Sequence, residues 1–192
     1  MRHPEIRNRI IEITCDIITR QGIRQAHVDD VARIAGISKR TLYEMFEDKN
    51  ALIFKCLERL SAWRHEMLQR RLESPDGNSL YKTIGFVREY VDSLYLLDVE
   101  FLADLKNKSA FAHNYESDSR FWREMLERLL NQAMHDGYIL EGSDLSLMAE
   151  TMLTRSYELR MAGRNRESQR FLNTALLRGI STAKGIALID NK

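Results

Sequence analysis

The sequence contains little proline, which leaves long segments free to form helices. Pro4 and Pro75 are the only prolines in 192 residues, so stretches of 70 and 117 residues contain none. Proline inside a helix removes a backbone donor and clashes with the preceding turn, so its absence favours helices. The alternation of apolar and polar residues typical of strands is scarce, and apolar residues instead recur with a 3.6-residue period. The sequence therefore predicts an all-α protein.

Cysteines and long apolar runs are also lacking. Cys15 and Cys56 are the only cysteines, and two thiols on separate expected helices provide neither a disulfide framework nor a four-ligand zinc site. We interpret both as packing residues. No run of more than seven residues lacks a charged side chain, whereas a transmembrane helix needs about 20 apolar residues. The first ten residues contain no apolar segment of signal-peptide length, so we expect a cytoplasmic protein with no membrane partner.

The overall charge gives no sign of a nucleic-acid partner. Basic residues number 29 and acidic residues 28, a net charge of +1. A protein with this balance has no global field that attracts a polyanion. Any nucleic-acid site must therefore be recognised from a local pattern.

Breaker and capping residues divide the chain into expected helices. Gly22 and Gly36 are suited to end the first two helices, and Ser38 and Asp48 to begin the next two. The segment SPDGNS at residues 74–79 is rich in turn formers and marks a domain boundary. The expected helices span residues 5–20, 28–35, 39–46, 49–73, 80–97, 99–112, 118–135, 144–162 and 168–187.

Residues 27–46 carry the most specific signal in the sequence. Two short helices are joined by Gly36, Ile37 and Ser38, and Gly36 can adopt positive φ without a Cβ penalty. This pattern predicts a helix-turn-helix, whose second helix enters the major groove of DNA. The apolar residues spaced to form its shared core are Val28, Val31, Ala35, Ile37, Leu42 and Phe46.

The charges in these two helices strengthen the interpretation. Asp29 and Asp30 lie in the first turn of the first helix, where the helix dipole favours acids. Lys39 and Arg40 lie in the first turn of the second, where exposed cations cost about 0.3–1 kcal/mol each. A polyanion explains the arrangement, because free amides and cations together bind phosphate or read a base edge. The alternative is that Lys39 and Arg40 only solvate a surface turn.

Residues 5–55 resemble the DNA-binding domain of the TetR family of bacterial transcriptional regulators. The resemblance implies that Tyr43 and Lys49 hold the DNA backbone, and that Lys39, Arg40 and Thr41 face bases and adjacent phosphates. Ser38 completes this predicted DNA-binding set, and the alternative for Tyr43 is that its ring only packs between helices. The matching residues are Gly22, Val28, Ile34, Ala35, Gly36, Ile37, Ser38, Thr41, Leu42, Tyr43, Phe46, Lys49 and Leu52.

Several positions depart from the family pattern, and two of them lie in the helix-turn-helix. His27 replaces a threonine that caps the helix and touches phosphate, and an imidazole can do either. Arg40 stands where many members have glycine, and the arginine side chain can reach further toward the bases. We include both in the predicted DNA-binding set, and we expect operator recognition to differ from that of relatives.

The C-terminal part lacks the motifs of catalysis and metal binding. It contains no glycine-rich phosphate loop, no CxxC and no HExxH, and the five histidines of the chain have no ligand spacing. We therefore expect no enzyme activity, no metal and no cofactor.

Large apolar side chains are instead concentrated in the C-terminal part, and most such residues form core. The resemblance implies that these helices also enclose an unidentified small-molecule effector, and that the last two helices pair with those of a second subunit. The candidate pocket residues are Phe86, Tyr90, Phe101, Phe121, Trp122, Met125 and Met152. The candidate dimer contacts are Met148, Tyr157, Phe171, Leu172, Ala175 and Leu176.

These features together predict a homodimeric repressor that binds a pseudo-palindromic double-stranded DNA operator. We expect a helix-turn-helix domain at residues 1–48, a connecting helix at 49–73, and an effector-binding and dimerisation domain at 74–192. One alternative is an all-α enzyme or ligand carrier, which predicts a convergent catalytic cluster. Another is a protein–protein adaptor that uses the helical domain. Only the DNA binder predicts strongly salt-dependent affinity for DNA.

Overall fold

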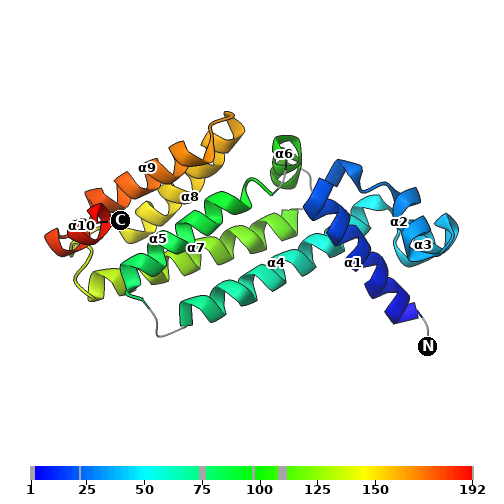
Figure 1. The fold of residues 1–192 in the computed structure, drawn as a ribbon, viewed down its shortest axis with the longest axis horizontal. Helices are drawn as coiled ribbons and strands as arrows, with labels where there is room; N and C mark the ends of the chain where they lie inside the picture. The colour runs from blue at the N-terminus through cyan, green and yellow to red at the C-terminus, as the bar shows by residue number, and fades with distance from the viewer. Residues whose placement is uncertain (1–2, 22, 74–76, 97, 108–111, 192) are drawn as a thin grey trace. The chain divides into compact units, whose positions relative to one another are not determined.

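The computed structural model describes residues 3–21, 23–73, 77–96, 98–107 and 112–191, which confirm the all-α prediction (Figure 1). Apart from an isolated antiparallel bridge between Ile139 and Ser181, these residues form no β-structure. None of their helices is long and apolar enough to cross a membrane. The helices are α1 (His3–Gln21), the 3-10 helix η1 (Ile23–Gln25), α2 (Val28–Ala35), α3 (Lys39–Met45), α4 (Lys49–Glu73), α5 (Ser79–Ser93), α6 (Val99–Asn107), α7 (Ala112–His135), α8 (Leu145–Met161), α9 (Arg166–Gly179) and α10 (Ala183–Asp190).

The chain divides into two compact units. Residues 1–67 and 96–117 form the first unit, and residues 68–95 and 118–192 form the second. The division passes through α4 and α7, so each of these helices contributes to both units.

The first unit is built around a core shared by α1, α2, α3 and the first half of α4. Ile10 and Ile18 of α1, Val31 of α2, Leu42 of α3 and Leu52 of α4 are buried in it. These residues follow the helical period that the sequence shows, because burial of one apolar stripe from each helix stabilises the packing. The core therefore fixes α3 by its buried side and leaves its other side exposed.

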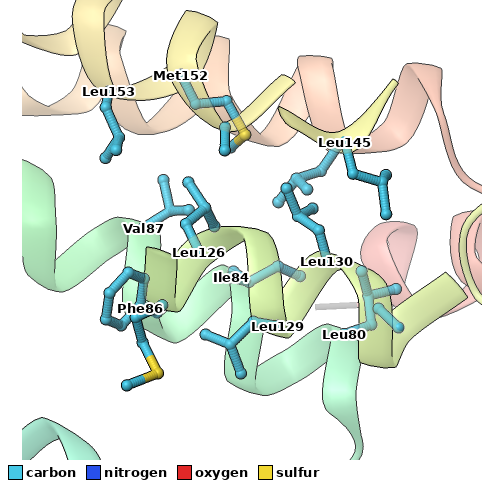
Figure 2. Close-up of a cluster of buried hydrophobic side chains, with 14 of the residues drawn as sticks. Leu80, Ile84, Phe86, Val87, Leu126, Leu129, Leu130, Leu145, Met152 and Leu153 are labelled. Carbon is cyan, nitrogen blue, oxygen red and sulfur yellow. The ribbon is translucent and has the colours of Figure 1, made fainter. Parts of the chain in front are cut away.

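The second unit is a helical bundle packed more heavily with large side chains. Phe86 of α5 and Trp122 of α7 are buried with their ring centroids 4.9 Å apart. Figure 2 shows Met152 and Leu153 projecting from α8 toward Val87 and other residues of α5 and α7. This interior of aromatic, leucine and methionine side chains holds α5, α7 and α8 together.

The predicted bounds agree with the structure for α2 and α4, and differ at the ends of other helices. We expected α5 to continue to residue 97 and α7 to begin at 118, whereas α5 ends at Ser93 and α7 begins at Ala112. Leu94 N–H bonds to the Tyr90 and Val91 carbonyl oxygens in a tightened last turn of α5.

The prediction of one helix over residues 168–187 is wrong, because the segment is divided into α9 and α10. Leu140 N–H donates to the Ile180 carbonyl at 2.9 Å, and Thr182 N–H donates to the Tyr138 carbonyl at 2.9 Å. Thr182 then caps α10 by accepting from Gly185 N–H at 3.2 Å. A Cβ on Gly185 would lie 2.2 Å from the Tyr138 carbonyl oxygen, so this close approach requires glycine. The break is thus created by a segment distant in sequence.

Candidate nucleic-acid interface

The turn between α2 and α3 has the backbone that the sequence predicts. Gly36 has φ of 72° and ψ of 33°, the left-handed conformation of a helix C-cap. Its N–H bonds to the Arg33 carbonyl at 3.2 Å, and Ile37 N–H bonds to the Ala32 carbonyl at 3.0 Å. The turn ends α2 at Ala35 and leaves three residues before α3 begins at Lys39, which is the connection of a helix-turn-helix.

Two hydroxyl groups lie at the N-terminus of α3. The Ser38 hydroxyl accepts a hydrogen bond from Thr41 N–H at 3.0 Å, so Ser38 is the N-cap that the sequence predicts. The Ser38 and Thr41 hydroxyl oxygens are 2.8 Å apart and also share a hydrogen bond. Ser38 is exposed and Thr41 half-buried, so two hydrogen-bonding groups border the start of α3.

Both cations of the first turn of α3 have carboxylate partners. The Lys39 ammonium lies 2.8 Å from the Asp29 carboxylate of α2, and this hydrogen bond raises the pKa of Lys39. Arg40 Nε lies 3.2 Å from Glu44 Oε1, one turn further along α3, with 90% of the Arg40 side chain exposed. These carboxylates offset part of the unfavourable interaction between the helix dipole and the two cations, a placement that we explained by a bound polyanion. Exposed ion pairs contribute little stability, so a phosphate can replace either carboxylate at small cost.

The remaining predicted DNA-binding residues border the same helix. Tyr43 of α3 is 42% exposed, so its ring is only partly used in packing. Lys49 begins α4 and is half-buried, directly after Asp48, whose carboxylate accepts from Ala51 N–H at 2.7 Å. His27 is the exposed N-cap residue of α2, and in the described chain its imidazole makes no capping hydrogen bond.

Sequence reasoning missed the contacts that support α3 from other helices. The guanidinium of Arg7 in α1 lies 4.9 Å from the ring centroid of Phe46, the buried C-cap of α3. The partnership between Asp29 and Lys39 was missed as well. A spacing of ten residues across a turn follows no helical period, and so the sequence carries no signal for this contact.

Six of the seven predicted effector residues lie in the core or the aromatic cluster of the second unit. Tyr90 and Phe121 are half-buried, with ring centroids 5.1 Å and 5.8 Å from that of Trp122. Phe86, Trp122, Met125 and Met152 are buried in the core. The side chain of Phe101 lies outside the part of the chain that the structure describes.

A cleft of about 320 Å³ lies beside this cluster, between the end of α4, the start of α5 and the end of α7. Its apolar wall includes Leu72, Met125 and Leu129, and its polar rim includes Lys82, Arg128 and Asp136. Met125 is the predicted effector residue that borders it. The cleft is wide enough for a small organic molecule, and most of its lining side chains are polar or charged.

The predicted dimer contacts lie along α8 and α9 with different exposures. Phe171 is 76% exposed and Ala175 is also exposed. The half-buried members are Met148, Tyr157, Leu172 and Leu176, of which Met148 and Leu176 pack against the core. Phe171 is therefore the most exposed large apolar side chain of this set.

Metal binding has no support in the described residues. They contain no group of three or more histidine, cysteine, aspartate or glutamate side chains positioned to hold a metal ion.

Comparisons with known proteins agree with this geometry. Residues 10–56 match the family model described as bacterial regulatory proteins, tetR family. The HTH-type transcriptional regulator YvdT of Bacillus subtilis, itself uncharacterized, is 24% identical over 157 residues, covering 76% of this chain and 75% of that protein. The HTH-type transcriptional regulator BetI of Klebsiella pneumoniae is 30% identical over 77 residues, which is 40% of each chain.

Solved structures share the fold. A protein described as a transcriptional regulator, from Saccharomonospora viridis and crystallised with choline, superposes with a TM-score of 0.78 at 14% identity, over 94% of this chain and 100% of that one. The transcriptional regulator FadR of Bacillus subtilis, crystallised with stearoyl-CoA, gives a TM-score of 0.64 at 16% identity, over 89% of this chain and 95% of that one. At these identities the likeness establishes the fold.

Proposed function

Because this chain belongs to the tetR family of bacterial regulatory proteins and is a helix-turn-helix transcriptional regulator, we propose that it is a ligand-responsive repressor. In this proposal a homodimer binds a pseudo-palindromic operator and a small molecule releases it. The proposed site of action is the cytoplasm, where the DNA lies, and no enzyme activity is part of the proposal. Residues 1–48 would read DNA, 49–73 connect, and 74–192 bind the effector and dimerise.

The observation that carries the DNA-binding part is the composition of the exposed N-terminus of α3. Ser38 and Thr41 supply hydroxyls, and Lys39 and Arg40 supply cations whose present partners are exposed carboxylates. Helix N-termini with cations bind phosphates, and arginine also recognises guanine through two hydrogen bonds. Tyr43 and Lys49 would add contacts to the DNA backbone on either side.

The size of α3 supports a dimer. A helix of seven residues offers too little surface for specific binding, so two copies must read successive major grooves about 34–36 Å apart. The exposed ring of Phe171 on α9 is the kind of apolar anchor that a second copy would cover. We therefore propose α8 and α9 as the dimer interface.

The effector part is supported by the second unit. Its cleft of about 320 Å³ adjoins an interior rich in aromatic and methionine side chains. Related folds have been crystallised with choline and with stearoyl-CoA, two ligands of different chemistry. The proposal therefore assigns the region of the effector site and not the compound.

Selection of genomic DNA fragments on the purified protein tests the DNA-binding part. We expect enriched fragments to share an inverted repeat, with affinity that falls steeply as salt increases. Fragments without a shared sequence, or binding that is insensitive to salt, would refute the proposed repressor.

A ligand screen by thermal shift tests the effector part. A compound that binds should weaken operator affinity, and the operator should weaken the compound by the same factor. Leu72→Trp, which enlarges a half-buried side chain of the cleft wall, is expected to blunt this response and leave DNA affinity unchanged. A ligand that stabilises the protein without any change in operator affinity would contradict a regulatory role.

A further inference from the structure

The two cysteines meet across the packing of α1 against α4. Cys15 Sγ of α1 lies 3.7 Å from the carbonyl oxygen of Cys56 in α4, and donates to it. Cys56 Sγ lies 3.6 Å from the carbonyl oxygen of Ile11, one helical turn before Cys15, and donates in return. Each thiol thus contacts the backbone of the other helix. No helical period predicts this contact, because 41 residues separate the two positions.

The two thiols have unequal surroundings. Cys56 is fully buried, whereas Cys15 keeps 8% of its surface exposed. A hydrogen bond from the Cys56 thiol lowers the pKa of Cys15; burial opposes this effect, and the positive charge of Arg59 lowers the pKa by a smaller amount. The same hydrogen bond, followed by burial, raises the pKa of Cys56. Cys15 is therefore the more reactive thiol, and Cys56 is the less reactive one.

We propose that Cys15 and Cys56 are an oxidation site that closes to a reversible intrachain disulfide when the protein meets a peroxide. The site lies in the first unit, apart from the predicted effector residues of the second. It extends the proposed function, since it would make DNA binding respond to oxidants as well as to an effector.

The chemistry requires one oxidant and no other reactant. The Cys15 thiolate attacks hydrogen peroxide, the O–O bond breaks, and Cys15 becomes a sulfenic acid as hydroxide leaves. Cys56 Sγ then attacks the Cys15 sulfur, and the sulfenic oxygen leaves as water. Two thiols lose two electrons in total, and one peroxide becomes two waters.

The disulfide would act on the DNA-reading elements that it encloses. The loop between the two cysteines contains all of α2 and α3, and Cys56 lies two helical turns after Lys49. A disulfide joins its sulfurs at about 2.05 Å, whereas each thiol here donates to a carbonyl oxygen of the other helix. We expect closure to break these contacts, to shift α4 against α1, and to displace Lys49 and α3 from the geometry that fits DNA.

Intact-mass spectrometry of the full chain tests the site without reference to DNA. The chain has only these two cysteines, so a loss of about 2 Da on treatment with hydrogen peroxide or diamide identifies the Cys15–Cys56 disulfide. We expect this loss, and its reversal by dithiothreitol. Cys15→Ser and Cys56→Ser should not show it, and in Cys56→Ser the Cys15 thiol should proceed to a mixed disulfide with added glutathione. A wild-type protein that keeps two alkylatable thiols after oxidation, while folded by circular dichroism, would overturn the proposal.

Fluorescence anisotropy on mixed-sequence DNA tests the consequence. Oxidised protein is expected to bind about 5- to 150-fold more weakly than reduced protein, the usual range for coupled sites, and dithiothreitol should restore binding. The double variant Cys15→Ser/Cys56→Ser should bind as the reduced protein does and ignore the oxidant. A disulfide that forms without a change in affinity would overturn the switch. Absence of DNA binding in the reduced protein would instead count against the proposed repressor.

Discussion

The Lys39 ammonium lies 2.8 Å from the Asp29 carboxylate, and this ion pair joins the first turn of α3 to the first turn of α2. The contact offsets the unfavourable position of Lys39 at a helix N-terminus. The positive end of the helix dipole disfavours the ammonium there, and the Asp29 carboxylate provides a nearby negative charge. Both side chains are exposed, so water screens the pair. The pair can therefore stabilise the orientation of α3 and still exchange its carboxylate for a DNA phosphate.

Replacing Asp29 by asparagine is expected to strengthen DNA binding. The change releases Lys39 from its carboxylate and removes a negative charge beside the proposed DNA-binding residues, so affinity should rise by about 1.5- to 5-fold on operator and mixed-sequence DNA alike. Asp30→Asn is the matched control, since Asp30 pairs with Arg33 inside α2 at 2.8 Å. Fluorescence anisotropy checks both. Equal effects of the two variants would show that the Lys39 partnership is irrelevant to binding.

Tyr43→Phe and Lys49→Ala are expected to weaken binding to operator and to mixed-sequence DNA by similar factors. Contacts to phosphate position a protein on the duplex without reading its sequence. Lys49→Ala should also reduce the salt slope of binding by about 1. Lys55→Ala, which removes a lysine paired with Glu58 further along α4, is the control and should bind normally. If either variant keeps full affinity on both DNAs, its assignment to the backbone is wrong.

Arg40→Gly is expected to relax sequence preference at one base pair of each half-site. A bidentate contact to guanine is worth about 1–3 kcal/mol, and the single Arg40–Glu44 ion pair of 3.2 Å leaves the guanidinium accessible to a base. Arg40→Ala separates the loss of the side chain from the added backbone freedom of glycine in α3. Selection of randomised half-sites measures the preference. A uniform loss of affinity across all sequences would make Arg40 a phosphate contact.

Phe171→Glu is expected to give helical monomers that lose operator binding. The ring is 76% exposed on α9, so a charge there disturbs an interface between subunits and not the interior of one. Leu176 is less suitable for this test, because it packs against the core of the second unit. Trp63→Glu alters another exposed apolar side chain, on α4, and should leave assembly unchanged. Sedimentation that finds an intact Phe171→Glu dimer would move the interface elsewhere.

Tyr95→Phe is expected to destabilise the second unit by about 1–3 kcal/mol. The Tyr95 hydroxyl accepts from Gln169 Nε2 at 2.7 Å and donates to the Arg164 carbonyl at 2.5 Å. Without it, the buried Gln169 amide keeps only a longer bond of 3.4 Å to that carbonyl. Tyr138→Phe is the control, since Tyr138 contacts Lys184 through its ring. Denaturant unfolding measures both, and equal stability of the two variants would contradict the role of the hydroxyl.

The sequence by itself determined the features that depend on neighbouring residues. Gly36, Ser38 and Asp48 fix where α2 ends and where α3 and α4 begin, because each satisfies backbone groups within one turn of itself. The apolar spacing likewise predicted the buried residues of α2 and α3, namely Val28, Val31, Ala35 and Leu42. The fold class and the helix-turn-helix follow from such local rules.

Only the tertiary structure decided which distant residues become partners. Lys39 meets Asp29, Cys15 meets Cys56, and the segment after Gly137 interrupts the last helix at residues 180–182. The cleft beside Met125 likewise arises where three helices converge. The physical reason is that a helical period records which face of a helix is apolar, but not which helix covers that face or in what register. That choice depends on the packing of all side chains at once, and no short stretch of sequence contains it.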